Sequence, residues 1–472
     1  MVTGPLRDDT MPRRLILFSN LFLVSLALLV AGARASGVNT DYQGIAEKIA
    51  RQGLSDNGAY SFLSRLVRTG PRLTGSPASA AAVELMFQEM LDLGLDNVHL
   101  EPTLVGRWVR GEAEEGRIIS SGLGTIPLAI CALGGSTATP EDGIRAGVVE
   151  VRSFEELRAL GEKARGKVVF YNRPMDPTRL DTFQAYGEAA DQRVLGAAEA
   201  AKAGGIAALV RSLAFGENDY PHTGLVKYSS EAAPLPAMAI STQGANILSR
   251  SLEVDPGLTV YLKTSCATLS PVTSHNVVGE IRGTDLPDEI ILLGAHLDSW
   301  DLGEGAHDDG AGCAHVLEAL RLLKAAGVHP KRTVRGVLFM DEEFGGTGGR
   351  DYARSEKRKG ERHLAAMESD RGGFLPVGFG GGGESVQKKL LEWHPFLRPL
   401  GIYWIGPGGG GVDIAPLAES GTAMMGIVPD SQRYFDVHHS SRDVLTAVNP
   451  RELELGAIVM AIVGFLLAQE GV

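Results

Sequence analysis

The chain has 472 residues and a formal net charge of −12, and 44% of its residues are hydrophobic while 22% are charged. This length allows two or three domains, each with its own core, and the composition is that of an ordinary globular protein. The acidic balance excludes nucleic acid as an expected partner, because proteins that bind it usually carry a basic surface.

The N-terminus has the three-part layout of a secretory signal peptide. Two arginines at positions 13 and 14 precede an apolar run over 15–30, and a small-x-small site follows and ends at Ala35. We predict a signal peptide over 1–35, cleavage near Ala35, and a secreted or periplasmic (cell-envelope) location. The alternative is a retained membrane anchor, although the apolar run is short for a full span.

Only three cysteines occur, Cys131, Cys266 and Cys313, so no disulfide framework holds this chain together. A single bridge would be compatible with export, and the sequence does not say which pair would form it. Cys313 falls on an apolar helical stretch, which favours a small buried residue over a nucleophile.

Helical periodicity dominates the first part of the mature chain. Apolar residues three and four apart predict helices over 41–52, 59–68 and 79–94. A strand is predicted over 97–105. We assign residues 36–105 to the same domain as residues 270–472, because the segment between them has a different character.

That intervening segment, residues 106–269, is rich in short strand candidates. They cover 147–151, 166–172, 206–212 and 237–241, and one helix is predicted over 192–204. The succession of strand, helix and strand between 166 and 212 is a β-α-β unit, which requires parallel pairing. The segment is therefore predicted to be a self-contained, inserted α/β module.

From about residue 274 onward, strands and helices alternate. Strands are predicted over 275–283, 289–298, 333–343, 363–370 and 423–430, and helices over 310–327 and 346–357. Nearly continuous apolar strands are typical of a sheet that is covered on both faces. The predicted fold is α/β, with a mostly parallel mixed sheet flanked by helices.

Polar side chains of ligand type follow these apolar strands. They are His296, Asp298, Asp308, Asp309, Asp341, Glu342, Glu343, Asp370, His438, His439 and Asp443. Ligands of open α/β sheets collect outside the carboxyl ends of the strands. A mixed set of imidazole and carboxylate groups favours zinc, and two ions about 3.5–4 Å apart can clamp the attacking and departing oxygens of a hydrolysis.

Each of these motifs also has an ordinary structural explanation. An Asp-Asp-Gly sequence before a helix is commonly an N-cap, and Asp-Glu-Glu is commonly a solvated turn. Their occurrence at successive strand ends favours a metal site. The adjacent Glu342 and Glu343 suit two roles, because neighbouring side chains at a strand end point in different directions: one can bind metal while the other moves protons.

The ordered motifs H-x-D, DDG, EE-x-G-x-x-G, ESD and HHS-x-x-D resemble those of the M28 family of co-catalytic zinc peptidases. The resemblance extends over roughly residues 42–460 and includes RWVRGE, GKVVFYNRP and PHTG. It implies that the inserted module is protease-associated-like and covers the active-site cleft. It also implies two zinc ions per chain and a homodimer.

Carried over by position, the resemblance assigns roles to seven residues. His296 and Asp370 would hold one zinc, and Glu343 and His439 the other. Asp308 would bridge the two ions, and Glu342 would be the general base. Asp298 would not bind zinc itself but would orient His296 and fix its tautomer. His439 is preferred to His438 because a small polar residue and then an acidic one, Ser440 and Asp443, follow it; His438 stays open as the alternative.

The implied activity is that of an exported metallopeptidase, a carboxypeptidase or dipeptidase that hydrolyses small peptides, mainly dipeptides with free N-termini, by a metal-bridging hydroxide. The alternatives are an aminopeptidase acting on longer peptides and an inactive binding protein of the same fold. Polar residues in loops near the site could select substrates: His222, Thr223, Arg371 and Tyr434. For Arg371 we weigh a carboxylate-binding role against an internal ion pair.

Other hydrolase and nucleotide-binding signatures do not occur in the sequence. There is no G-x-S-x-G for a serine hydrolase, no H-E-x-x-H for a single-zinc protease, and no G-x-x-x-x-G-K for phosphate binding.

Overall fold

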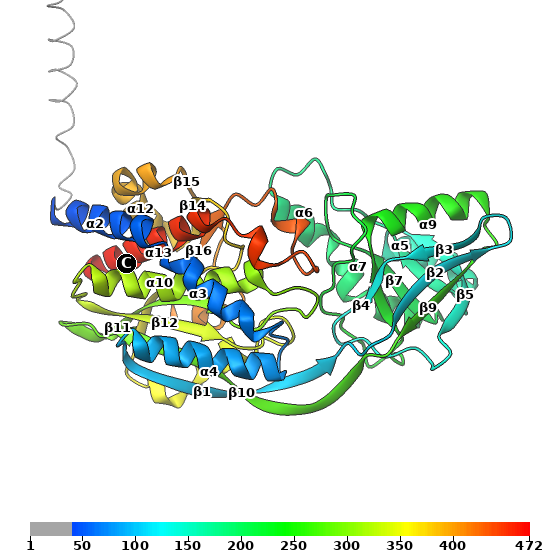
Figure 1. Cartoon of the computed structure of the whole chain (residues 1–472), viewed down its shortest axis with the longest axis horizontal. Coiled ribbons are helices and arrows are strands. Elements are labelled where there is room, and N and C mark those ends of the chain that lie inside the picture. The colour runs from blue at the N-terminus through cyan, green and yellow to red at the C-terminus, as the bar shows by residue number, and fades with distance from the viewer. Residues whose placement is uncertain (1–39) are drawn as a thin grey trace, which may run out of the picture. The chain divides into compact units, whose positions relative to one another are not determined.

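The computed structural model describes residues 40–472 (Figure 1). The predicted signal peptide and its cleavage site lie outside the described residues. The strands of the described part form two eight-stranded sheets.

The first sheet has a parallel centre and antiparallel neighbours. Its strand order is β1-β10-β12-β11-β13-β16-β14-β15. The bounds are β1 Asp96–Val109, β10 Ala267–Ile281, β11 Leu286–His296, β12 Arg332–Phe339, β13 Arg362–Glu368, β14 Pro376–Gly381, β15 Trp404–Gly406 and β16 Ala423–Pro429. Strands β12, β11, β13 and β16 are mutually parallel, while β10 and β14 run antiparallel to this group. The predicted α/β class with a mostly parallel mixed sheet is confirmed.

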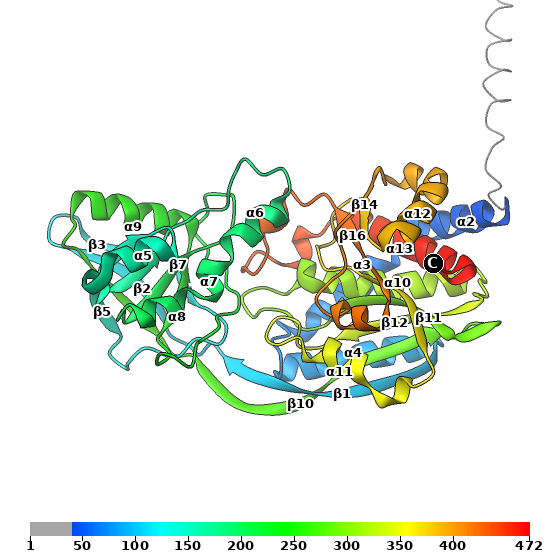
Figure 2. The ribbon, with the colours of Figure 1, turned by 180° about the vertical axis from the view of Figure 1, so that it is seen from behind.

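Helices cover both faces of this sheet. On one face lie α2 Thr40–Asp56, α3 Gly58–Leu66, α4 Pro77–Asp92, α10 Ala311–Ala325, α12 Gly383–Leu397 and α13 Pro450–Glu470. On the other lies α11 Thr347–Arg354. Figures 1 and 2 show these faces from opposite sides, with α10 nearer in the first view and α11 in the second. Successive residues of β11, Leu292 and Leu293, pack into different cores, which explains why the central strands are apolar at nearly every position.

The C-terminal helix α13 is largely buried. It is long and apolar enough to cross a membrane, but 83% of its most apolar stretch is buried inside the protein. Its N-terminus is closed by Asn449, whose side chain accepts hydrogen bonds from the backbone N–H groups of Arg451 and Glu452. We therefore describe it as a core helix that packs on α10 and the central strands.

The two glycine clusters, Gly380–Gly383 and Gly408–Gly411, pack against each other. A Cβ atom placed on Gly409 would lie 2.2 Å from the carbonyl oxygen of Gly380, and one placed on Gly411 would lie 1.8 Å from Oε1 of Glu368. Contacts this short leave no room for a side chain. Close approach of the backbone therefore explains why glycine stands at these positions.

The second sheet is formed entirely within residues 106–269. Its order is β3-β2-β9-β5-β6-β7-β8-β4. The bounds are β2 Glu114–Ser120, β3 Gly124–Leu128, β4 Ile130–Ala132, β5 Ile144–Val151, β6 Val168–Tyr171, β7 Ala207–Arg211, β8 Ala237–Ile240 and β9 Thr259–Thr264. Strands β5 to β8 are parallel. The protease-associated-like character of this module stays a prediction.

The module has helices on both faces of its sheet. They are α5 Phe154–Leu160, α6 Thr182–Ala189, α7 Asp191–Val194, α8 Gly196–Lys202 and α9 Thr242–Val254. Residues of α9 share one core with the sheet, and residues of α5 and α8 share the other. The chain enters the module from β1 and leaves it into β10, and these strands pair along their whole length up to Val109 and Ala267.

All three cysteines are free and buried. The single disulfide that the sequence left open is absent. Cys313 lies in α10, as expected for a small buried residue, and its Sγ donates to the carbonyl oxygen of His296 at 3.0 Å.

Candidate metal centre

The site lies where the parallel strands of the first sheet end. Strand β11 ends at His296, β12 leads into residues 341–343, and β13 leads into Asp370. Residues 306–310 precede α10 and carry Asp308, and the loop after β16 carries residues 438–439. Because these strands are parallel neighbours, their carboxyl ends bring all five segments to one edge of the sheet.

Asp308 stands between two groups of side chains. Its Oδ1 lies 3.3 Å from Nε2 of His296, and its Oδ2 lies 3.1 Å from Nε2 of His439. On the first side, Nε2 of His296 is also 3.3 Å from Oδ1 of Asp370. On the second side, Nε2 of His439 is also 3.3 Å from Oε2 of Glu343. The two oxygens of one carboxylate thus face two separate histidine–carboxylate pairs.

These donors fit divalent cations. Oδ2 of Asp308 and Oε1 of Glu343 are buried and accept no hydrogen bond from the described residues. A buried carboxylate oxygen without a partner costs free energy, and a bound cation would remove that cost. Ligand atoms of His296, Asp308 and Glu343 all lie within 4.8 Å of one another, as do those of His296, Asp309 and Asp370.

The electrostatic field of the site favours positive charge. Burial alone would lower the pKa of His296, yet the carboxylates of Asp370 and Asp308 hold this pKa well above its usual value. In the same way, Glu343 and Asp308 outweigh burial and raise the pKa of His439 well above its usual value. A site with this charge balance stabilises cations at both histidines.

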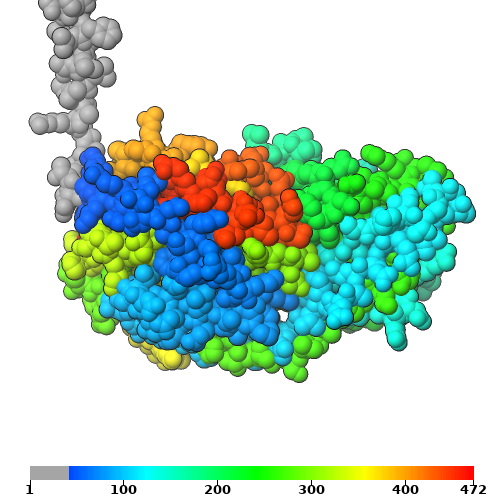
Figure 3. All heavy atoms as spheres, viewed as in Figure 1, coloured from blue at the N-terminus to red at the C-terminus, as the bar shows by residue number. Residues whose placement is uncertain are grey.

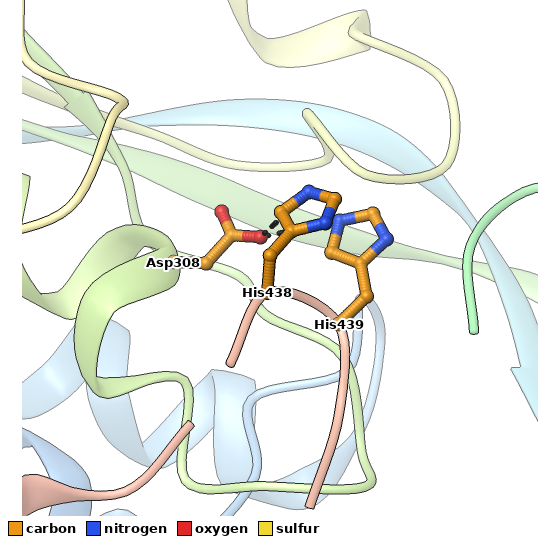
Figure 4. A group of neighbouring side chains, drawn as sticks. All are labelled: Asp308, His438 and His439. Carbon is orange, nitrogen blue, oxygen red and sulfur yellow. Dashed lines mark ion pairs between the residues drawn. The ribbon is translucent and has the colours of Figure 1, made fainter. Parts of the chain in front are cut away.

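His438 and His439 both approach the central carboxylate, with rings stacked 3.5 Å apart (Figure 4). His439 faces both Asp308 and Glu343, whereas Nε2 of His438 reaches only Oδ2 of Asp308, at 3.6 Å. Burial and the neighbouring His439 lower the pKa of His438 well below its usual value. The contacts favour His439 as the ligand, in agreement with the residue preferred from the sequence.

The orientation of His296 comes from the main chain. Its Nδ1 lies 3.0 Å from the carbonyl oxygen of Asp298, whereas the nearest carboxylate oxygen of Asp298 is 3.8 Å away. A proton on Nδ1 would leave Nε2 free to accept or to bind metal. Asp298 thus contacts His296 through its main-chain carbonyl group and not through its carboxylate.

The Asp298 carboxylate instead fastens the loop that carries the two glutamates. It accepts hydrogen bonds from the backbone N–H groups of Asp341, Glu342 and Glu343, at 2.9, 3.2 and 3.3 Å. The hydroxyl of Thr74 donates to its Oδ2 at 2.5 Å. Asp298 is completely buried, so the loop and the strand end are held as one unit.

Glu342 is half-buried and lines the same cavity as Asp308, Glu343 and Asp370. Burial, with the carboxylates of Asp370 and Glu343 nearby, raises the pKa of Glu342 well above its usual value. A carboxylate with a raised pKa can accept a proton and hold it, as a general base requires.

Two further aspartates, Asp309 and Asp443, hold residues 306–310, which carry Asp308, in place. Asp309 accepts from the backbone N–H groups of His296 and Gly312, at 3.1 and 2.9 Å, and so links the end of β11 to the first turn of α10. Asp443 accepts from the backbone N–H groups of His307 and Asp308, at 2.6 and 3.1 Å. Burial and the Asp308 carboxylate raise the pKa of Asp443 to about 7. Sequence reasoning had singled out both residues without separating them from the ligands.

Arg72 is a functional residue that the sequence did not reveal. It is completely buried, and its guanidinium donates to the carbonyl oxygens of Leu297, Glu304 and Gly305. It therefore fixes the loop between β11 and α10. Its only sequence signal is an arginine between glycines, which is too common to indicate such a role.

The inserted module holds the histidine loop. The backbone N–H of Thr223 donates to the carbonyl oxygen of His439 at 2.9 Å, and Nδ1 of His439 lies 3.3 Å from the carbonyl oxygen of Thr223. Nδ1 of His222 lies 2.7 Å from the carbonyl oxygen of His438. Figure 3 shows C-terminal residues in red beside module residues in green. His222 and Thr223 are thus near the site, as expected, but they position the loop.

A cavity of about 290 Å³ opens onto the metal-binding residues, and both the module and the catalytic part contribute to it. Its lining comprises Phe183, Tyr186, Arg193, Val194, Leu225, Lys227, Asp308, Glu342, Glu343, Asp370, Tyr434, His438 and His439. Tyr434 lies here as expected. The volume is at the small end of the range for ligand pockets, about 300–1,000 Å³.

Arg371 lies elsewhere. Its guanidinium sits 4.6 Å from the ring centroid of Phe183, and it lines a neighbouring cavity of about 840 Å³. It makes no ion pair among residues 40–472. The internal ion pair weighed for Arg371 is therefore not formed within these residues, and its carboxylate-binding role stays a prediction.

Comparison with known proteins defines the class. The profile of peptidase family M28 matches residues 276–462. A peptidase M28 precursor from Shewanella amazonensis superposes with a TM-score of 0.87 at 32% identity, over 92% of this chain and 98% of that one. The chain belongs to peptidase family M28 and is a metallopeptidase.

Within that family, carboxypeptidase Q is similar over nearly the whole chain. The protein from Bos taurus is 36% identical over 477 residues, which covers 96% of this chain and 98% of that one. The protein from Homo sapiens is 37% identical over 422 residues, covering 89% and 87%. A zinc aminopeptidase from Bacillus subtilis shares the fold, with a TM-score of 0.63 at 20% identity over 88% of this chain and 96% of that one.

Proposed function

We propose that the protein is a two-zinc exopeptidase that hydrolyses dipeptides with free N-termini. The observation that carries the proposal is the position of Asp308, whose two oxygens face different histidine–carboxylate pairs. His296, Asp308 and Asp370 would hold one zinc, and Asp308, Glu343 and His439 the other. The carboxypeptidase name of the similar proteins supports an exopeptidase, and the small cavity supports a short substrate.

When bound, zinc would supply Lewis-acid chemistry here: it would polarise the scissile carbonyl group and lower the pKa of the attacking water. Glu342 accepts the proton of that water and delivers it to the departing amine. Burial keeps the pKa of Glu342 raised, so the carboxyl group can carry the proton between the two steps. Asp298 holds the backbone of Glu342 and Glu343 and so fixes their separate directions.

The acidic wall of the cavity suits a free amino terminus. Three carboxylates there, Glu342, Glu343 and Asp370, lie beside the metal-binding histidines. Because Glu343 and Asp370 would hold zinc, Glu342 is the carboxylate left to attract a substrate ammonium group, whereas an N-acetyl group carries no charge to attract.

The proposal is tested by hydrolysis of one dipeptide and its N-acetylated form by the mature chain from Ser36, each with zinc and with a chelator. Zinc-dependent cleavage of the free dipeptide alone is the expected result. Cleavage of neither form by zinc-loaded protein would overturn the dipeptidase assignment, and equal cleavage of both would overturn recognition of the amino terminus.

A second candidate function is that of an aminopeptidase acting on longer peptides. The observation that favours it is the larger cavity of about 840 Å³, which shares Phe183 with the catalytic cavity. Further residues of a longer chain could pass the Phe183 ring into this space. Faster zinc-dependent cleavage of a tetrapeptide than of the matching dipeptide would select this function.

We also propose export after cleavage near Ala35, and assembly as a homodimer. The signal-peptide layout of residues 1–35 supports the first, and the family resemblance supports the second. N-terminal sequencing of protein recovered outside the cytoplasm, and its mass by light scattering, test these two statements separately.

A further inference from the structure

The two walls of the catalytic cavity carry opposite charges. The catalytic part contributes the carboxylates, while the inserted module contributes two cations, Arg193 on α7 and Lys227. Lys227 is exposed, whereas Arg193 is only 8% exposed. A buried cation on the far wall of a peptidase cavity calls for an anionic partner.

No carboxylate of the described chain pairs with Arg193. Its Nη2 donates to the hydroxyl of Tyr186 at 2.6 Å, and its Nη1 donates to the carbonyl oxygen of Thr223 at 3.4 Å. Its Nε is buried and has no hydrogen-bond partner. A buried guanidinium with only neutral acceptors and an idle donor is incompletely compensated.

The position of this guanidinium is fixed by its surroundings. It lies 5.2 Å from the ring centroid of Tyr186, and that ring packs edge-on against His438 with centroids 5.1 Å apart. Behind it is Gly224, with φ of 138°, where a Cβ atom would lie 2.5 Å from Cζ of Arg193. A side chain at position 224 would therefore displace the guanidinium, so the glycine makes the space that it occupies.

We propose that Arg193 binds the C-terminal carboxylate of the dipeptide substrate; this inference rests on the proposed function and names the residue that restricts it to dipeptides. In a dipeptide, the C-terminal carboxylate lies one residue beyond the scissile bond. One residue spans at most about 3.6 Å, so the group that binds this carboxylate must lie close to the catalytic residues. Arg193 lines the same small cavity as Glu342. The planar guanidinium matches a carboxylate with paired hydrogen bonds.

The zwitterionic substrate then matches the charges of the cavity at both ends. Its ammonium group lies on the side of Glu342, and its carboxylate faces Arg193, with Lys227 adding positive charge. A longer peptide would place a neutral amide where the carboxylate belongs, and the buried charge of Arg193 would remain uncompensated.

The test compares a dipeptide with its C-terminal amide, both with free N-termini, on zinc-loaded wild type and Arg193→Gln. Wild type is expected to prefer the free dipeptide, and Arg193→Gln to lower the ratio of the two kcat/KM values at least about tenfold, since a hydrogen bond to a charged group is lost. Arg193→Lys keeps the charge but loses the paired N–H donors of the guanidinium, so its ratio of kcat/KM values should lie between those of wild type and Arg193→Gln. Arg371→Gln, an arginine outside the cavity, should leave the ratio unchanged.

A binding measurement separates recognition from turnover. In the Glu342→Gln background, calorimetry should show tighter binding of the dipeptide than of its amide, and Arg193→Gln should abolish the difference. If Arg193→Gln lowers kcat/KM equally for the dipeptide and its amide, so that their ratio is unchanged, Arg193 has a structural role and the inference is overturned. Equal cleavage of dipeptide and amide by wild type would overturn it while leaving the dipeptidase function intact; cleavage of neither, with cleavage of a longer peptide, would overturn both.

Discussion

The two sheets carry helices on both faces, but different residue types follow their parallel strands. In the first sheet, β11 ends in His296, and β13 is followed by Asp370. In the second sheet, β7 is followed by Ser212, which donates to the carbonyl oxygen of Ile240, and β8 by Ser241, which caps α9. Within residues 40–472, the clusters able to hold a metal all belong to the first sheet.

The comparison of the two sheets shows that the fold brings strand ends together, and that the residue types at those ends decide what the ends can bind. Parallel strands bring their carboxyl ends together in both sheets. Hydroxyl groups at such ends satisfy neighbouring backbone groups and leave no charge, whereas carboxylates and imidazoles leave buried lone pairs that attract cations. The module acts on the site through its loops and through α6 and α7, not through its strand ends.

The largest expected effect comes from the proton carrier at the end of β12. Glu342→Gln should lower kcat by about 10²–10⁴-fold, because a general base is removed, while the zinc content stays that of wild type. Steady-state kinetics and metal analysis of the same sample measure both. Survival of full activity would show that another group takes the proton.

Substitution of each of the two adjacent histidines shows which one binds metal. His439→Ala should reduce bound zinc by about one ion per chain and abolish most activity, because it faces both Asp308 and Glu343. His438→Ala is the matched control and should keep the wild-type zinc content. Atomic absorption after dialysis measures the difference, and the reverse pattern would move the ligand to His438.

Asp298 tests whether the strand end and the glutamate loop act as one unit. Asp298→Asn weakens acceptance from three backbone N–H groups, so we expect activity or zinc affinity to fall by about 10–100-fold, as for other residues that support metal ligands. Thr74→Val, which removes only one donor to this carboxylate, should have a smaller effect. An unchanged Asp298→Asn enzyme would contradict the role given to this residue.

The smallest effect concerns a buried carboxylate away from any strand end. Burial and the neighbouring Glu318 raise the pKa of Glu454 in α13 from 4.5 to about 8. Because the folded pKa exceeds the unfolded one, its contribution to stability is complete below about pH 4.5 and is lost as pH rises through about 8. The free energy of unfolding should therefore fall by roughly 1–3 kcal/mol from pH 5 to pH 9.

Glu454→Gln should remove this part of the pH dependence, as measured by urea unfolding at both pH values. Glu452→Gln, in the same helix and paired at the surface with Arg433, serves as the control and should keep the wild-type slope. An identical slope in Glu454→Gln would show that the carboxyl group is ionised throughout.

Much of the fold could be predicted, because its elements carry strong local patterns. The helices predicted over 41–52, 59–68 and 79–94 correspond to α2, α3 and α4, and the apolar strands to β11, β12 and β13. Helix α13 was missed because it is buried on nearly all sides and lacks the polar face that reveals a helix. Strands β14 and β15 are short and glycine-rich, which hides them.

The candidate ligands could be singled out from the sequence because their motifs follow apolar strands or precede a helix, and the resemblance to the M28 family implied their roles. Of the residues that support them, Asp298 was predicted from the resemblance, whereas Arg72 and Thr74 were not. Thr74 and Asp298 are 224 positions apart, and Arg193 reaches the cavity only through the packing of the module. Such contacts depend on the tertiary structure, which local sequence patterns do not predict.

The central claim is that Asp308 lies between two zinc ions. Anomalous X-ray scattering at the zinc edge, from crystals of the mature protein grown with zinc, tests it most directly. Two peaks about 3.5–4 Å apart, one beside His296 and one beside His439, each within bonding distance of a different oxygen of Asp308, are the predicted result. A single peak, or two peaks with Asp308 bound to only one, would contradict the account.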